Sequence, residues 1–192
     1  MKHILGPNST SSLTNVKDGD SQPNAVDLRL GDVFKIDDRQ TFYIDDEKKE
    51  HRGSTRVFPD HADVYNLAPG SYEVVMENVI TVGEGEAGFV ITRSTLNRNG
   101  LFLTTGLYDT GYNGVMAAVL HVTSGPARIK KGTRIGQYLN FDAENLSSYS
   151  GDYGIGSAHD TKYGVEEIFN QICGVEETEA SVPTDPNIKR GR

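Results

Sequence analysis

The middle of this 192-residue chain is a succession of short apolar segments separated by glycine or proline turns. Several segments alternate apolar and polar residues, as Val26, Leu28 and Leu30 do, which is the period of a half-buried strand. Many short strands at close spacing indicate an all-β sandwich or barrel. The segments expected to form strands are residues 26–30, 33–36, 72–76, 79–82, 88–91, 101–105, 115–122, 127–130 and 135–141.

The segments that flank this region differ from it in composition. Residues 44–63 include a dense run of charges and are expected to form a solvated loop. Residues 165–172 carry apolar side chains at helical spacing. The predicted organisation is a flexible polar N-terminal arm (1–21), a β domain (22–142), a Gly/Ser-rich closing segment with a short C-terminal helix (143–175) and a disordered tail (176–192).

Charge and composition exclude several classes of protein. The net charge of −8 argues against binding to a nucleic-acid backbone. Cys173 is the only cysteine, so no intramolecular disulfide can form. No apolar run approaches the roughly 20 residues of a membrane span, and the N-terminus lacks the apolar core of a signal peptide. We therefore expect a cytoplasmic protein that has no membrane or nucleic-acid partner.

A glycine-flanked turn at residues 104–114 holds the best candidate for chemistry. Asp109 lies between two apolar segments, and a carboxylate there can orient and deprotonate a water. Gly106 allows the backbone to approach a ligand closely, and Tyr112 offers a ring that can stack on a sugar or base. The alternatives are an Asp that caps the turn and a half-buried strand Tyr.

Five other polar residues are candidates for contacts with phosphate or metal. Arg93 and Ser94 form a possible phosphate cradle, and Arg98 adds a second positive charge. Asp27 is a candidate for a magnesium–triphosphate site, directly or through water, and Gln137 for phosphate or water. Each residue also has an ordinary reading as a surface or sheet-face side chain.

A second glycine-rich stretch, residues 151–157, contains Gly154 and Ser157. Backbone N–H groups of such a stretch can fold over a triphosphate. A plain flexible loop has the same composition, so the motif is weak when taken alone.

The order of these motifs resembles that of the dUTPase and dCTP deaminase superfamily. The resemblance covers about residues 22–141 and is carried by residues 22–31 (QPNAVDLRLG), 67–70 (LAPG), 93–101 (RSTLNRNGL), 105–114 (TGLYDTGYNG) and 131–137 (KGTRIGQ). It implies a distorted, jelly-roll-like β-barrel that forms a homotrimer with active sites between subunits. It also implies Mg²⁺ and a deoxyuridine or deoxycytidine triphosphate.

One position separates the two branches of this superfamily. Deaminases carry a proton-transferring Glu in the strand after the 105–114 motif, where this chain has Val119. The resemblance therefore favours a dUTPase that converts dUTP to dUMP and pyrophosphate. It assigns the water-activating base to Asp109 and sugar stacking to Tyr112. It also assigns phosphate binding to Arg93 and Ser94, contact with phosphate or the catalytic water to Gln137, and a hydrated metal to Asp27.

Two departures leave other readings open. The C-terminal dUTPase motif has Arg and Phe where this chain has Ser150 and Ile155, so Arg98 or Lys162 would have to compensate. Leu103 and Thr104 stand where an Asn usually contacts uracil. The alternatives are a dCTP deaminase or a hydrolase of a modified pyrimidine nucleotide, and a nucleotide-binding regulator of a partner protein with weak or no catalysis. A divergent tail would also suit a phage protein acting in the host cytoplasm.

Overall fold

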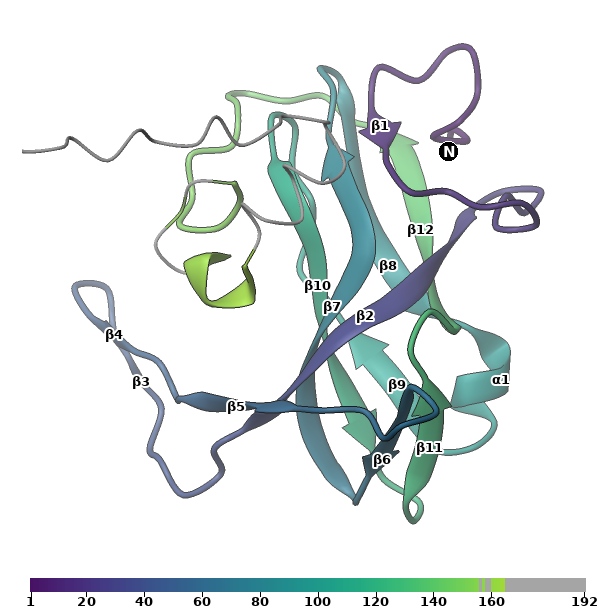
Figure 1. The fold of residues 1–192 in the computed structure, drawn as a ribbon. Helices are drawn as coiled ribbons and strands as arrows, with labels where there is room; N and C mark the ends of the chain where they lie inside the picture. Colours follow the sequence, from purple (N-terminus) through teal and green to yellow (C-terminus); the bar gives the residue numbers. More distant parts are fainter. Residues whose placement is uncertain (156, 158–159, 165–192) are drawn as a thin grey trace, which may run out of the picture.

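The computed structural model describes residues 1–155, 157 and 160–164, and it is almost entirely β-structure (Figure 1). Its helical elements are a single turn, α1 (Ser94–Asn97), and a 3-10 helix, η1 (Asp160–Tyr163). The expected all-β class is confirmed. The strands are β1 (Ser12–Leu13), β2 (Val26–Ile36), β3 (Tyr43–Ile44), β4 (Lys49–Glu50), β5 (Ser54–Val57), β6 (Val64–Leu67), β7 (Gly70–Thr81), β8 (Glu86–Thr92), β9 (Leu101–Thr104), β10 (Asn113–Val122), β11 (Ala127–Lys130) and β12 (Arg134–Asp142).

The main sheet curls until its two edges approach one another. Its antiparallel strands follow the order β8-β12-β2-β7-β10-β9, with β1 on β7 and β5 on β2. The Leu103 N–H of edge strand β9 donates to Thr92 Oγ1 of edge strand β8 at 2.7 Å. The strands enclose a main apolar core with Leu28, Leu120 and Ile135 fully buried, and a smaller buried cluster includes Phe34 and Val115. This nearly closed sheet confirms the expected distorted barrel.

Two local expectations differ from the structure. The strands expected at 72–76 and 79–82 are one continuous strand, β7, and the break in pattern is a bulge where the β10 register shifts between Val115 and Ala117. Helix α1 directly follows β8 and was not expected, because one turn is too short to show a period. The helix expected at 165–172 lies outside the described residues.

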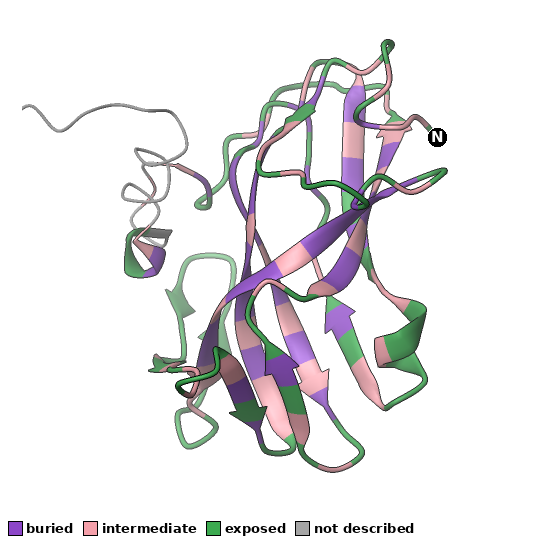
Figure 2. Cartoon of the chain, turned by 45° about the vertical axis from the view of Figure 1, so that its right-hand side comes forward, coloured by how far each residue is buried: buried purple, intermediate pink, exposed green. Residues whose placement is uncertain are grey.

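The charged segment 44–63 is solvated over most of its length, as expected. Strands β3 and β4 form a small hairpin away from the barrel, and residues 43–52 are exposed (Figure 2). Strand β5, however, joins the main sheet against β2. Among the described residues, no helix is long and apolar enough to cross a membrane.

The N-terminal segment was expected to be a flexible arm, and this is wrong. Ser11 and Asp20 are buried in it, and Ile4 belongs to the core. The Asp20 carboxylate accepts from the Arg29 guanidinium of β2 at 2.6 Å. Polar composition misled the prediction because these side chains pair with groups on distant strands.

Glu86, at the start of β8, is the centre of this docking. Its fully buried carboxylate accepts hydrogen bonds from Ser9 Oγ, Thr10 N–H, Ser11 Oγ and Asn140 Nδ2, at 2.6–3.0 Å. Burial by itself raises the pKa of Glu86, but these hydrogen bonds outweigh it and lower the pKa to about 2. The ionised carboxylate therefore fastens the N-terminal segment to the barrel.

We expect acid to release this segment from the barrel. Because the folded pKa is depressed, the contribution of Glu86 is complete above its usual value of 4.5 and is lost as the pH falls towards about 2. In the wild type, amide hydrogen exchange at residues 9–11 should become faster as the pH falls through that window. In Glu86→Gln, the same amides should exchange fast at every pH. Glu84→Gln, an exposed neighbour, is the control. A wild-type profile that stays flat down to pH 2 would contradict the assignment.

Candidate functional site

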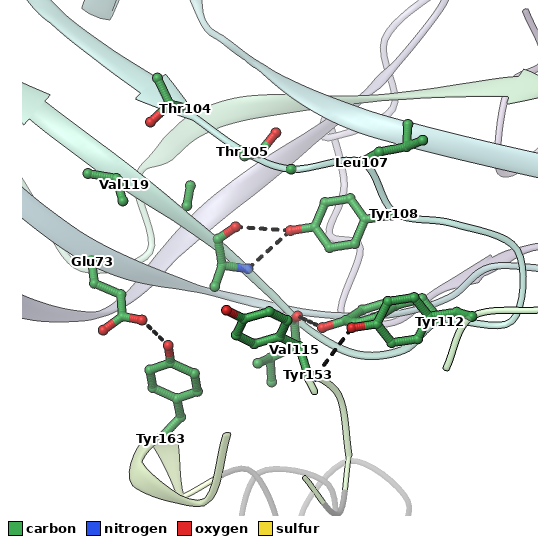
Figure 3. Close-up of a pocket in the computed structure, with 14 residues that line it drawn as sticks. Glu73, Thr104, Thr105, Leu107, Tyr108, Tyr112, Val115, Val119, Tyr153 and Tyr163 are labelled. Carbon is green, nitrogen blue, oxygen red and sulfur yellow. Dashed lines mark hydrogen bonds between the residues drawn. The ribbon is translucent and has the colours of Figure 1, made fainter. Parts of the chain in front are cut away.

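A hollow of about 470 Å³ opens between the face of β10, the loop after β9 and the segment from Tyr149 to Tyr163 (Figure 3). Its lining contains five tyrosines, small aliphatic residues, two threonines and the carboxylate of Glu73. This volume lies in the range of small-molecule sites, and the predominance of apolar and aromatic walls is typical of them. Val119 and Gly106 both line the hollow.

Tyr112 lines the hollow and is also part of the core. Its hydroxyl donates to the Val115 carbonyl at 2.8 Å, and its ring makes edge contacts with Tyr108 and Tyr149. The side chain is 7% exposed. The structure thus shows a buried tyrosine that packs in the core directly before β10, and sugar stacking stays a prediction.

The glycines beside Tyr112 let the C-terminal segment approach the hairpin. A Cβ on Gly114 would lie 2.8 Å from the Gly154 Cα and 2.7 Å from the Tyr112 hydroxyl, so no side chain fits. The Ile155 N–H donates to the Asn113 carbonyl at 3.0 Å. Ser157 continues this segment, and its N–H donates to the Gly154 carbonyl at 3.0 Å. The glycine-rich stretch therefore packs beside the Asp109–Tyr112 turn.

Asp109 lies outside the aromatic hollow. It is exposed, and it borders a separate concavity formed with Thr110 and residues 143–150. Its backbone carbonyl accepts the Tyr112 N–H at 3.0 Å. In the part of the chain that the structure describes, the Asp109 carboxylate has no hydrogen-bond or ionic partner. This carboxylate is therefore available to a ligand or a water.

A second group of predicted residues gathers around Asp27, which is fully buried. Gln137, directly opposite it in the β2–β12 ladder, donates to Asp27 Oδ1 at 3.0 Å. Arg93 lies 3.3 Å from the same oxygen. Arg134 and Gln22 reach Oδ2 at 3.3 and 3.2 Å. These last two were missed as site residues, although both lie in the motifs that carry the resemblance.

The charge of this cluster suits an anion. Two guanidinium groups, those of Arg93 and Arg134, share one carboxylate, which leaves an excess positive charge beside exposed Ser94 and Arg98. Both oxygens of Asp27 are occupied by these donors. The described residues contain no group of three or more His, Cys, Asp or Glu that suits a metal ion. Mg²⁺ usually keeps several waters and binds through one or two carboxylates plus substrate phosphates. Because its two oxygens already accept these donors, Asp27 offers such an ion no direct ligand.

The two groups of residues lie at opposite ends of β8. Tyr108 pairs with Gly88 near the start of the strand. Arg93 follows the other end of β8. At about 3.3 Å per residue of extended strand, it lies about 16 Å from Gly88. None of Asp27, Arg93 or Gln137 lines the aromatic hollow. A single chain therefore does not bring all the predicted site residues together.

Comparisons with known proteins identify the family of the chain. A model of the dCTP deaminase-like family matches residues 7–142. The probable deoxyuridine 5'-triphosphate nucleotidohydrolase of Aeropyrum pernix is 32% identical over 138 residues, which are 70% of this chain and 85% of that protein. The deoxyuridine 5'-triphosphate nucleotidohydrolase of Methanocaldococcus jannaschii is 29% identical over 153 residues, 78% of this chain and 97% of that protein.

A similar fold occurs in the crystal structure of 2'-deoxycytidine 5'-triphosphate deaminase from Agrobacterium tumefaciens, with a TM-score of 0.53 and 16% identity. The match covers 72% of this chain and 45% of that one, so this chain spans less than half of that structure. At this identity the likeness concerns the fold alone.

Proposed function

This chain belongs to the dCTP deaminase-like family, within the dUTPase and dCTP deaminase superfamily, and on that basis we propose that it hydrolyses dUTP to dUMP and pyrophosphate. The names of its relatives support a dUTP nucleotidohydrolase. The observation that carries the choice of hydrolysis is Val119. This aliphatic side chain lines the hollow where a deaminase would need a proton-transferring carboxylate on β10.

The proposed roles follow from charge and exposure. The free carboxylate of Asp109 activates the attacking water, while Arg93, Ser94 and Arg98 bind phosphate oxygens. Gln137 contacts phosphate or the water. Asp27 fixes the side chains of Arg93 and Gln137, and it reaches the metal only through water.

Other residues position the substrate. The hollow beside Tyr112 and Gly106 holds the nucleoside. Gly154 and Ser157 bring backbone N–H groups towards the phosphates. Bound Mg²⁺ would neutralise charge on the transferring phosphate, which is the main requirement of such a reaction.

We propose further that the active site is completed in a homotrimer. The separation of the Asp27 cluster from the aromatic hollow supports this, because each needs a complement that its own chain does not supply. An apolar outer face on β8 and β12 also supports it. Phe89 and Ile91 are 36% and 39% exposed there, and the Phe89 ring stacks on Phe141 at 5.4 Å. Exposed aromatic patches of this kind mark interaction sites.

Phe89→Asp should separate the subunits and stop turnover. A charge in a desolvated interface costs several kcal/mol, so light scattering should report the monomer mass, and dUTP hydrolysis should fall by about 100-fold or more. Phe58→Asp is the matched control, because Phe58 is 76% exposed on another surface. A Phe89→Asp trimer of full activity would exclude this face as the interface.

Product analysis with dUTP, dCTP and dTTP tests the reaction itself. We expect pyrophosphate and dUMP from dUTP in the presence of Mg²⁺, and none after chelation. Ammonia from dCTP would instead assign the chain to the deaminase branch. Absence of any product would contradict the hydrolase assignment.

A regulator of a partner protein is a second candidate function. The β3–β4 hairpin presents Phe42, Tyr43 and Ile44 at 42–56% exposure on an arm that extends from the barrel. Exposed apolar side chains on an extension are typical of a protein-binding surface. Nucleotide binding without turnover in the same assay would favour this function.

A further inference from the structure

The hollow contains a carboxylate that the sequence motifs do not mark. Among the described residues that line it, Glu73 is the one acid. It comes from β7, which follows the Pro69-Gly70 turn and carries none of the motif residues assigned to chemistry. Its side chain is 16% exposed. Placing a charge among tyrosines and aliphatic groups is costly unless the charge is paired, so its presence needs an explanation.

The strand register places Glu73 beside the position that distinguishes the two branches. Val119 on β10 pairs with Glu73 on β7 and with Thr104 on β9. Directly paired residues of antiparallel strands project from the same face, with Cβ atoms about 5 Å apart. The three side chains therefore form one row across the wall of the hollow, with Val119 in the middle (Figure 3).

The groups that hold Glu73 come from the C-terminal segment. Lys162 Nζ donates to one carboxylate oxygen at 2.9 Å, and the Tyr163 hydroxyl donates to the other. At the other end of the row, Thr104 Oγ1 is hydrogen-bonded to His121 Nε2 at 3.1 Å. A carboxylate has about four acceptor sites, so two donors leave capacity for a ligand.

We propose that Glu73 determines base specificity by accepting the ring N–H of a 4-oxo pyrimidine. This inference rests on the proposed function, because it takes the nucleoside to occupy the hollow. Uracil and thymine both present N3–H at that edge, whereas cytosine presents an N3 lone pair that a carboxylate repels. Glu73 would thereby supply the polar contact that Leu103 and Thr104 lack in place of the usual Asn.

The alternative is that Glu73 only fastens the C-terminal segment over the hollow. The two roles predict different effects on the binding of nucleotides that carry different bases. A fastening group affects all nucleotides alike, whereas a group that reads the N3 position affects cytosine and uracil in opposite directions. Thymine shares the uracil edge, so dTTP provides a control within the same enzyme.

Glu73→Gln tests the proposal in the full-length protein, because an amide can present either a donor or an acceptor to N3. We expect the KM for dUTP to rise about 10-fold and kcat to change less than about threefold, since base contacts are made equally in ground and transition states. The preference for dUTP over dCTP should fall by more than about 10-fold, because the dCTP KM should decrease. The ratio of dUTP to dTTP should stay unchanged.

Two further variants separate recognition from fastening. Lys162→Met removes one of the groups that hold the carboxylate but leaves Glu73 itself, so it should weaken all nucleotides alike. Glu77→Gln changes a carboxylate on the same strand that pairs with Lys17 outside the hollow, and it should behave as wild type. If Glu73→Gln affects dUTP and dCTP equally, or if Lys162→Met changes their ratio as much, the proposal is overturned.

Calorimetric binding of dUMP and dCMP distinguishes this inference from the proposed reaction. Selective binding of dUMP that is lost in Glu73→Gln supports the inference even if no triphosphate is hydrolysed. Hydrolysis of dUTP with unchanged selectivity in Glu73→Gln overturns the inference and leaves the reaction standing. Absence of both binding and turnover overturns both.

Discussion

Replacing Asp109 with Asn should reduce dUTP hydrolysis by about 10²–10⁴-fold, the usual contribution of a general base. Asn keeps the size and polarity of Asp but cannot take a proton from water. Because the carboxylate is exposed and makes no partner contact in the described part of the chain, its loss should leave the fold intact. Single-turnover kinetics with saturating dUTP and Mg²⁺ would measure the chemical step directly.

Nucleotide affinity and stability decide how this result is interpreted. The dissociation constant of a non-hydrolysable dUTP analogue and the Tm should both stay close to wild type in Asp109→Asn. Asp46→Asn, on the exposed β3–β4 hairpin, controls for the loss of one surface charge. Hydrolysis by Asp109→Asn within a few-fold of wild type would falsify the role of Asp109 as base.

Asp27→Asn should damage both stability and activity. It leaves Arg93 and Arg134 without their counter-charge at a fully buried position. Breaking a wholly buried ion pair costs about 3–5 kcal/mol, and because the two guanidinium groups are 30% and 35% exposed we expect a loss of about 3 kcal/mol here. For a chain of this length the Tm should fall by roughly 10 °C. Turnover should fall with it, because Arg93 and Gln137 lose the group that fixes their positions.

Asp32→Asn provides a matched comparison. Asp32 also pairs with two cations, Arg56 and Lys131 at 2.8 and 2.9 Å, but Asp32 is itself 14% exposed and the two cations are 49% and 40% exposed. Solvent screening limits such pairs to about 1 kcal/mol or less. Equal losses of Tm in the two variants would show that burial at Asp27 does not control the effect.

The strands were predictable because alternation along a strand is a local property. Residues 26–36, 113–122 and 134–142 each carry their pattern in consecutive positions, and their turns are marked by Gly or Pro. The fold class followed from this density of strands. The N-terminal segment was mispredicted for the opposite reason, since Ser11 finds its partner Glu86 far along the chain.

The candidate site was predictable as a set of residues but not as a geometry. Asp27 and Gln137 were identified separately, and only the β2–β12 register shows that one donates to the other. Glu73 was missed because its importance depends on Val119, the residue that pairs with it on the neighbouring strand β10. The sequence also does not reveal that Asp109 and Arg93 lie at different ends of β8.

The composition of the aromatic hollow links ligand binding to the position of the C-terminal segment. Tyr149, Tyr153 and Tyr163 come from the C-terminal segment, whereas Tyr108 and Tyr112 come from the hairpin, so the walls exist only while the two are together. A ligand held there favours the closed state, and by reciprocity any contact that holds the segment down raises the ligand's affinity. Since the described part of this segment adds no strand to the barrel, its displacement would break none of the ladder hydrogen bonds between the barrel strands.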